Sequence, residues 1–198
     1  LRGNPGVTAM IEHHEWSSAD LAHPAALLRQ RSGATQLARH WPYSTAADPK
    51  ALSTDRVRKY TQLMSASQPL VSQDVLDAYD FARHRCLLDV GGGDGTFLAA
   101  VAGRCPGLSL QLFDLPAVVT IAGEKLASRG LSTRIERCGG SFISDPLPRG
   151  ADVISLIRVL HDHDGLAPES RDLVDGVAPV AIRHERQRAA VREPGGGA

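Results

Sequence analysis

The sequence predicts an α/β protein built on a doubly wound parallel sheet, and three observations support this. A short apolar run at residues 87–90 has the length and composition of a buried strand. Residues 91–95, four of them glycine, interrupt it, and Phe97, Leu98 and Val101 then recur at helical spacing. Apolar runs and helical periods continue to alternate as far as residue 160. Helices are expected before this region, and the sheet is expected to be incomplete at its C-terminal side.

The elements of the sheet follow from the same alternation of periods. We expect four strands joined by glycine turns and helices, in this order: strand 87–90, helix 95–103, strand 108–113, helix 117–129, strand 133–138 and strand 152–157. Beyond residue 164 no fifth, sixth or seventh strand is predicted.

The first fifty residues predict helical pieces. Ser18 or Asp20 is a candidate cap for a short helix, and residues 24–37 carry apolar residues at helical spacing. The helical pattern ends at residues 41–43, which contain a proline. The sequence begins at Leu1 and resembles the interior of a longer protein, so we expect a fragment.

A longer helix is expected directly before the glycine strand. Between residues 56 and 78, apolar and small side chains step by three or four, and Pro69 predicts a kink or break. Core packing is the simpler interpretation of Tyr60 and Met64. The alternative is that Met64, Ser67 and Gln68 help to wall a substrate cavity at the edge of the sheet.

These patterns divide the chain into three parts. We expect a helical segment at 1–80 that ends in the linking helix. A ligand-binding core is expected at 81–165, and a divergent or truncated tail at 166–198. The basic run between residues 183 and 192 is expected to be solvated or disordered.

Composition excludes several classes of partner. Lysine plus arginine and aspartate plus glutamate each number 22, so the excess of positive charge typical of nucleic-acid-binding proteins is missing. Three widely spaced cysteines favour a reducing compartment. No apolar run approaches the roughly 18 residues of a membrane span. We expect a cytoplasmic protein, with a peripheral position on a membrane as the alternative, and no metal, because His13 and His14 lack further ligands at matching spacing.

The glycine turn predicts a nucleotide-like ligand. Glycine leaves the amide groups of a helix N-terminus accessible to a ligand. The spacing from Asp89 through Gly91 and Gly93 to Gly95 is D-x-G-x-G-x-G, the signature of class I S-adenosylmethionine (AdoMet) methyltransferases. A dinucleotide fingerprint would need glycine where Thr96 stands, so an NAD-dependent oxidoreductase is a weaker alternative. A carboxylate at Asp89 suits AdoMet, which has a sulfonium cation where a dinucleotide has its diphosphate.

The next two strand ends supply further candidate cofactor contacts. Asp114 lies nineteen positions beyond Gly95 at the end of the second strand, where it can accept hydrogen bonds from both ribose hydroxyls. Helix capping before Pro116 is a compatible second role. The third strand ends near Ser141 and Phe142, which are candidates for hydrogen bonding and packing against the adenine.

The fourth strand delivers a candidate catalytic base. His161 follows the strand end at which ligands collect in open α/β sheets, and histidine titrates near neutral pH. The alternating His-Asp-His-Asp of residues 161–164 also permits a metal interpretation. Alternation in a strand puts the two histidines on one face and the aspartates on the other, and no further ligands are found, so a general base is favoured over a metal site.

Four motifs in order resemble the caffeate-type O-methyltransferase family. They are the L-L-D-V-G-G-G-D-G of residues 87–95, F-D-L-P at 113–116, G-G-S-F at 139–142 and L-H-D-H at 160–163. Within that family the chain is most similar to the bacterial carotenoid branch, the demethylspheroidene (hydroxyneurosporene) O-methyltransferases. Histidine replaces the tryptophan that usually ends the last motif.

The resemblance implies a Rossmann-like fold and transfer of the AdoMet methyl group to a hydroxyl of an apolar acceptor, here a hydroxylated carotenoid. It implies His161 as general base and a homodimer for the full-length protein. It also implies that the helical segment 1–80 includes the tail of a dimerisation domain. The expected cofactor-binding residues are Asp89, Gly91, Gly93, Gly95, Asp114, Leu115, Ser141, Phe142 and Arg158, and the expected substrate-binding residues are Met64 and Gln68.

The sequence departs from the family after Asp164. The helix, P-G-G turn and apolar strand expected there are replaced by a divergent tail. The alternative hypothesis is therefore a non-catalytic, methyltransferase-like fragment that acts as a binding or interaction module.

Overall fold

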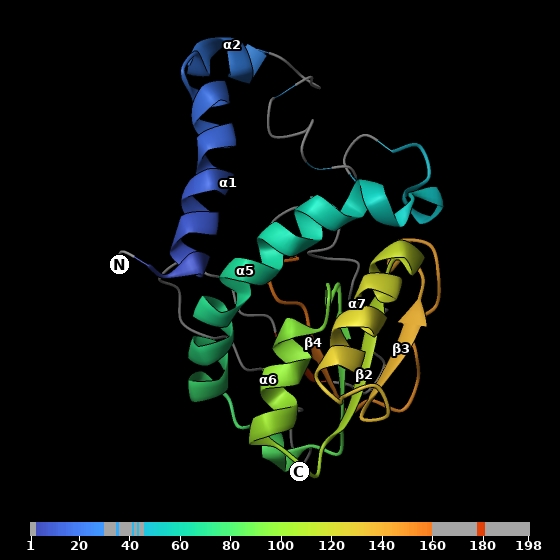
Figure 1. Ribbon diagram of the computed structural model, residues 1–198. Coiled ribbons are helices and arrows are strands. Elements are labelled where there is room, and N and C mark those ends of the chain that lie inside the picture. Colours follow the sequence, from blue (N-terminus) through green and yellow to red (C-terminus); the bar gives the residue numbers. More distant parts are fainter. Residues whose placement is uncertain are drawn as a thin grey trace, which may run out of the picture.

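A five-stranded sheet forms the centre of the computed structural model, which describes residues 3–29, 35, 41, 43, 46–159 and 178–180. All its strand pairs are parallel, in the order β3-β2-β1-β4-β5 (Figure 1). The elements of the core are β1 (Cys86–Val90), α6 (Thr96–Arg104), β2 (Ser109–Asp114), α7 (Pro116–Ser128), β3 (Ile135–Gly139), β4 (Val153–Ser155) and β5 (Ala178–Val180). The predicted doubly wound parallel sheet is confirmed.

The register aligns the carboxyl ends of the central strands. Val90 of β1 pairs with Phe113 of β2, and Asp114 pairs with Gly139 of β3. On the other side Asp89 pairs with Ser155, the last residue of β4. Four strands therefore end along one edge, which is the edge where ligands bind in open α/β sheets.

Side chains alternate between two apolar clusters along β1. Leu87 belongs to the larger cluster, which joins the sheet to helices α5, α6 and α7, whereas Leu88 and Val90 belong to a second cluster on the opposite face. Phe142 and Leu147, from the connection between β3 and β4, pack on that second cluster. Figure 1 shows α6 and α7 side by side in front of the sheet. Burial of both faces explains why β1 is apolar at every position except Asp89.

The N-terminal helices are α1 (Pro5–Leu21) and α2 (Pro24–Arg29), and a short 3-10 turn, η1, covers Pro49–Ala51. Asn4 caps α1, since its side chain accepts hydrogen bonds from the amides of Gly6 and Val7. The prediction that Ser18 or Asp20 caps a helix is wrong, because both lie inside α1. The hydroxyl of Ser18 instead donates to the carbonyl of His14, one turn earlier.

Helix α5 (Thr54–Ala78) connects the N-terminal part to the core and is followed by the 3-10 turn η2 (Phe81–Arg83). Pro69 lies within α5, and because the helix continues beyond it, the proline does not end the helix there. The helix changes direction partway along its length (Figure 1). Its first part runs across the carboxyl edge of the sheet, and its second part packs beside α6.

The expectation that no further strand follows the fourth one is wrong, because the sheet contains strand β5. Residues 178–180 pair in parallel with β4, Val153 opposite Ala178 and Ser155 opposite Val180. An Ala-Pro-Val segment carries no period that could have predicted a strand. The basic run at 183–192 lies outside the described residues.

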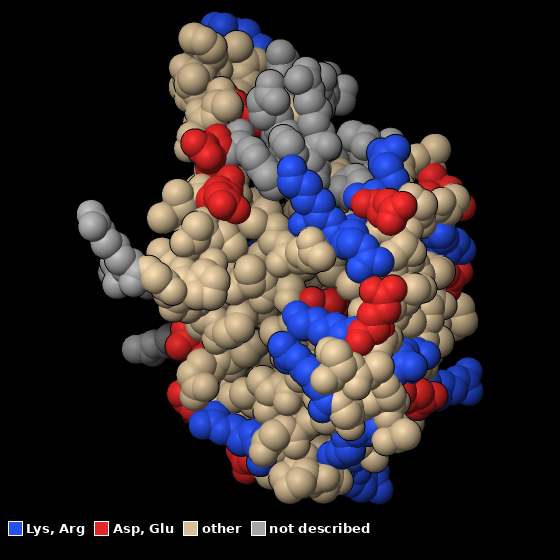
Figure 2. Space-filling model, in the orientation of Figure 1, with Lys and Arg blue, Asp and Glu red and all other residues tan. Residues whose placement is uncertain are grey.

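The described helices include none that is long and apolar enough to cross a membrane. On the face drawn in Figure 2, basic and acidic side chains are intermixed over the described surface.

Candidate functional site

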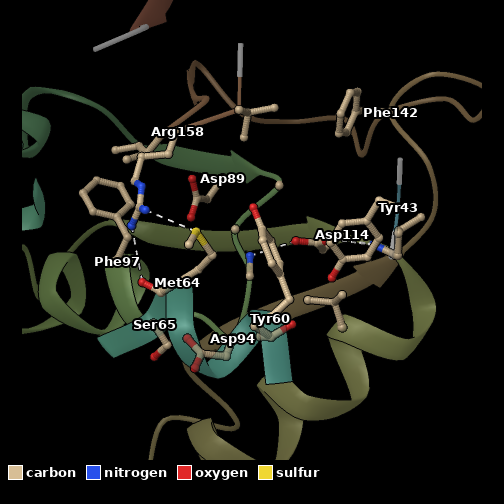
Figure 3. A pocket seen from close by; sticks show the side chains of 18 of the residues that line it. Tyr43, Tyr60, Met64, Ser65, Asp89, Asp94, Phe97, Asp114, Phe142 and Arg158 are labelled. Atoms are coloured by element: carbon tan, nitrogen blue, oxygen red, sulfur yellow. Dashed lines mark hydrogen bonds between the residues drawn. The ribbon is translucent and has the colours of Figure 1, made fainter. Parts of the chain in front are cut away.

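A cavity of about 210 Å³ opens at the carboxyl edge of the sheet (Figure 3). It is bounded by the β1–α6 glycine turn, the end of β2, the connection after β3, the turn after β4 and one face of α5. The lining residues are Trp41, Tyr43, Pro49, Tyr60, Thr61, Met64, Ser65, Gln68, Asp89, Gly91, Gly92, Gly93, Asp94, Thr96, Phe97, Asp114, Leu115, Val118, Gly140, Ser141, Phe142, Ile143, Ile157, Arg158 and Val159.

The glycine turn brings backbone to the cavity wall. Gly91 and Gly93 both have positive φ, 69° and 60°, which side-chain-bearing residues rarely adopt. A Cβ at Gly91 would lie 2.6 Å from Val159 Cγ2, so this position also requires glycine for space. A Cβ at Gly93 would meet no atom within 4 Å. The turn is therefore tight on its inner side and open at Gly93.

Asp114 binds the glycine turn from the end of β2. Its Oδ2 accepts a hydrogen bond of 2.8 Å from the amide of Gly93, and its Oδ1 accepts one of 2.7 Å from the amide of Leu115. Burial raises the pKa of Asp114 to about 6, against these two hydrogen bonds, which lower it. Each carboxylate oxygen can accept a second hydrogen bond, so the group retains capacity for a ligand.

Asp89 is almost fully buried at the end of β1 and faces the same cavity. Its Oδ1 accepts a hydrogen bond of 2.6 Å from the hydroxyl of Ser155 in β4. Burial raises the pKa of Asp89 to about 7, while the Ser155 hydrogen bond lowers it and the nearby charge of Asp114 adds to the rise. The cavity therefore holds two carboxyl groups of raised pKa, which is a common property of functional sites.

Ser141 and Phe142 lie in the cavity wall after β3, as expected. The backbone amide of Ser141 donates to Asp145 Oδ2 at 2.8 Å, and the other oxygen of Asp145 forms an ion pair of 3.0 Å with Lys50. Asp145 is absent from the cavity lining, so it supports the loop that carries Ser141 and Phe142.

Arg158 joins the turn after β4 to helix α5. Its guanidinium donates to Ser67 Oγ at 2.9 Å, to the Met64 carbonyl at 3.4 Å and to the Met64 sulfur at 3.2 Å. Arg158 has a φ of 62° and is the only non-glycine residue with positive φ in the described part of the chain. In Figure 3, Arg158 and Met64 lie on one side of Asp89, and Asp114 and Tyr43 lie on the other.

Three aromatic side chains that the sequence did not assign to the site pack together in the cavity wall: Trp41, Tyr43 and Tyr60. Tyr60 of α5 packs edge-to-face with Tyr43, with ring centroids 5.7 Å apart, and stacks with Trp41 at 6.5 Å. Burial raises the pKa of Tyr43, opposed by a hydrogen bond with Thr61. Trp41 and Tyr43 are separated from α5 in sequence and no spacing rule connects them to Tyr60, so no local signal could have placed them here.

The structure brings together most of the residues that the sequence predicts. Every predicted cofactor-binding residue except Gly95 lines the cavity, and so do the predicted substrate-binding residues Met64 and Gln68. Gly95 is instead the cap residue at the start of α6, packed against Leu126 of α7. His161 lies outside the described residues. Ser67 is buried behind the wall, where it holds Arg158.

Among the residues that the structure describes, no group of three or more potential metal ligands lies together. Asp94, Thr96 and Ser65 line the cavity but form hydrogen bonds with Lys125 behind it. No spacing rule connects these four positions, which come from three different segments.

Comparison with known proteins connects this cavity to one family. A family model described as an O-methyltransferase domain matches residues 33–171. The chain is 47% identical over 163 residues to demethylspheroidene O-methyltransferase of Cereibacter sphaeroides. The match covers 80% of this chain and 41% of that protein. The chain is 41% identical over 162 residues to the enzyme of the same name from Rhodobacter capsulatus, covering 80% of this chain and 38% of that protein.

Solved structures share the fold. The structure titled LaPhzM has a TM-score of 0.72 at 24% identity and covers 98% of this chain and 59% of its own. NcsB1, an O-methyltransferase from neocarzinostatin biosynthesis solved with S-adenosyl-L-homocysteine (AdoHcy) and 1,4-dihydroxy-2-naphthoic acid, has a TM-score of 0.64 at 25% identity. That match covers 83% of this chain and 51% of NcsB1. The chain thus spans about two fifths of the length of the curated relatives and somewhat over half of these structures.

Proposed function

Because the chain belongs to the O-methyltransferase domain family, we propose that its protein transfers a methyl group from AdoMet to a hydroxyl of an apolar acceptor. The observation that carries this proposal is the meeting of Asp114 with the glycine turn over one cavity, since Asp114 Oδ2 accepts from the Gly93 amide at 2.8 Å. The relatives named demethylspheroidene O-methyltransferase support a hydroxylated carotenoid as the acceptor.

The residues of the cavity fit AdoMet. Asp114 keeps two oxygens that can accept hydrogen bonds from ribose hydroxyls. Leu115 and Phe142 lie in the cavity wall on either side of the β2–β3 edge, where they offer apolar surface to an adenine ring. Arg158 would supply a cation for the carboxylate of the amino-acid part, and Asp89 in its ionised form would supply a negative charge for the cationic groups. Gly91 and Gly93 allow the ligand to approach the backbone.

Helix α5 provides the acceptor side of the proposed site. Met64, Gln68 and Tyr60 line the cavity from one face of this helix. When bound, AdoMet supplies an electrophilic methyl group on a sulfonium sulfur. The protein's main task is to hold the acceptor hydroxyl in line with that methyl group, which can contribute up to roughly 7–11 kcal/mol to catalysis.

We propose His161 as the general base that removes the proton of the acceptor hydroxyl. In the sequence it follows Arg158, which lines the cavity, by three positions. An aliphatic alcohol is much less acidic than a phenol, so a base acting during the attack would contribute on the order of 10² to 10⁴ in rate.

The division of the chain at residues 80 and 165, a homodimer for the whole protein, and a cytoplasmic or membrane-peripheral location are part of the same proposal. They rest on the resemblance to family members rather than on a contact in the described residues.

The proposal is tested first by binding. Isothermal titration of AdoHcy into the protein should show saturable binding that Asp114→Ala reduces at least about 100-fold, because both the ribose contact and the hold on the glycine turn are lost. Asp77→Ala, which removes an exposed carboxylate far from the cavity, is the matched control. Equal affinities in wild type and Asp114→Ala would contradict the assignment.

Turnover is tested separately with labelled AdoMet and a purified hydroxylated carotenoid, with a phenol as a competing acceptor. His161→Ala should bind AdoHcy normally and lose methyl transfer. Retained transfer would remove His161 as the base, and binding without any transfer by the wild-type protein would support the non-catalytic alternative.

A further inference from the structure

A partly buried polar cluster lies behind the glycine turn, formed by Lys125, Asp94, Thr96 and Ser65. The Lys125 ammonium is 2.6 Å from Asp94 Oδ2 and 2.7 Å from Thr96 Oγ1, and it also donates to Ser65 Oγ. Lys125 stands in the last turn of α7, Asp94 and Thr96 belong to the glycine turn and the start of α6, and Ser65 belongs to α5. We call this group the Lys125 cluster.

The hydrogen bonds of the Lys125 cluster form a complete set. An ammonium has three donors, and each meets one oxygen of the cluster. The second oxygen of Asp94 accepts from the Thr96 hydroxyl at 2.7 Å and from the Thr96 amide at 3.2 Å. Ser65 and Thr96 share a further hydrogen bond of 3.0 Å. Both Asp94 oxygens are therefore engaged within the protein.

Charge balance explains why a lysine is needed there. The Asp94 side chain is only 6% exposed, while the Lys125 side chain is 27% exposed. A buried carboxylate without a cation or sufficient donors is strongly unfavourable, so removal of one partner of such a pair costs much more than loss of a surface pair. Lys125 thus determines whether Asp94 keeps its position at the start of α6.

The cluster joins the two sides of the proposed site. Asp94 and Thr96 continue directly from Gly93, the residue that donates to Asp114, whereas Ser65 is the neighbour of Met64 on α5. Asp94, Thr96 and Ser65 line the cavity, and Lys125 does not. We infer that Lys125 is a positioning residue: through Asp94 and Ser65 it fixes the cofactor-binding glycine turn against the acceptor-side helix α5.

An ion pair that joins α5 directly to α7 provides a matched control. Arg58 of α5 and Glu124 of α7 form an ion pair of 3.0 Å, and Glu124 is the residue before Lys125. Their side chains are 36% and 58% exposed, and neither lines the cavity. Arg58→Met therefore removes a link between α5 and α7 without touching the glycine turn.

The experiment compares AdoHcy affinity by titration at a temperature well below each variant's unfolding midpoint, and it rests on the proposed function. Lys125→Met should weaken AdoHcy binding about tenfold or more, because it leaves Asp94 buried without its cation. Asp94→Asn combined with Lys125→Met should recover affinity to within about threefold of wild type, since a neutral amide still accepts from Thr96 and needs no cation. Arg58→Met should bind as wild type does.

A role in stability alone predicts a different pattern, in which Lys125→Met lowers the unfolding midpoint and leaves the affinity unchanged. That result, or a double variant as weak as Lys125→Met, would overturn the inference. If Lys125→Met does not fold, Lys125→Arg keeps the charge and should still show weaker binding, because the planar guanidinium cannot place three donors on the same oxygens; undiminished affinity in Lys125→Arg then overturns it. Failure of the wild-type protein to bind AdoHcy would instead contradict the proposed function.

Discussion

Asp89 and Asp114 are two carboxyl groups that share one cavity in different hydrogen-bonding environments. Asp114 accepts from two backbone amides, whereas Asp89 accepts from the single hydroxyl of Ser155. Burial raises the pKa of both, to about 6 for Asp114 and about 7 for Asp89. The protein without ligand thus keeps a carboxyl group at the end of β1 that is easily protonated near neutral pH.

The raised pKa of Asp89 predicts a pH-dependent free energy of unfolding. The native state holds the proton up to about pH 7, while the unfolded carboxyl releases it near its ordinary value of 3.8. Stability conferred by this group is therefore complete below that ordinary pKa and is lost as the pH rises toward 7, with a slope of at most about 1.4 kcal/mol per pH unit. Urea unfolding between pH 4 and pH 8 measures this slope.

Asp89→Asn should reduce the slope in that interval, because the amide has no proton to release. The contribution of Asp114, whose pKa burial raises to about 6, should remain. Asp77→Asn is the control, since Asp77 is exposed and its hydrogen bond with Gln73, together with the ion pair with Arg104, holds its pKa below the ordinary value. An Asp89→Asn profile that keeps the wild-type slope would show that another group titrates.

The parts of helix α5 before and after Pro69 pack against different parts of the protein. Its cavity-lining residues all precede Pro69, whereas Val71 and Val75, which follow it, pack into the main apolar cluster. A proline inside a helix removes one backbone hydrogen bond and bends the axis. The bend lets the first part of α5 cross the edge of the sheet while the second part stays packed beside α6 (Figure 1).

Pro69→Ala should weaken ligand binding without lowering the stability of the protein. Alanine restores the missing amide donor, so the free energy of unfolding should stay equal or increase, while straightening of the helix moves the cavity-lining half. We expect AdoHcy affinity to fall several-fold in a protein that is no less stable. Titration and urea unfolding of the same variant measure both quantities, and undiminished affinity would show that the bend has no part in binding.

At the scale of the whole molecule, the sheet gathers segments that are distant in sequence. The order β3-β2-β1-β4-β5 places four strand ends beside one another, and α5 covers them from a segment that precedes all four. Residues between 41 and 159 thereby contribute to a single cavity. A ligand held by so many segments binds the native state and has no equivalent site in the unfolded chain.

Ligand binding should therefore stabilise the whole protein. AdoHcy at about 100 times its dissociation constant should add about 2.7 kcal/mol to the free energy of unfolding, which corresponds to roughly 5–10 °C in unfolding midpoint for a chain of this size. Differential scanning calorimetry measures the shift. NAD is the comparison ligand and should produce none, and a shift with NAD alone would favour the oxidoreductase alternative.

Local sequence patterns were sufficient to predict much of the fold and part of the site. The strand–glycine turn–helix unit, the aspartate at the end of β2 and the alternating elements were predictable because each depends on neighbours close in sequence, through periodicity and backbone conformation. The position of each strand end then followed from parallel pairing. The short strand β5 and the true cap of α1 were missed, because Ala178–Val180 has no periodic pattern and several polar residues could have capped the helix.

Sequence by itself thus determined the class of fold, the glycine turn and the acidic residues that flank it. Only the tertiary structure decided that Tyr43 and Tyr60 pack together in the cavity wall, that Gly95 caps α6 outside the cavity lining, and that Lys125 meets Asp94. The physical reason is that a cavity wall is made by side chains from several elements at once, and their meeting depends on how whole helices pack on a sheet. No spacing along one segment records that packing.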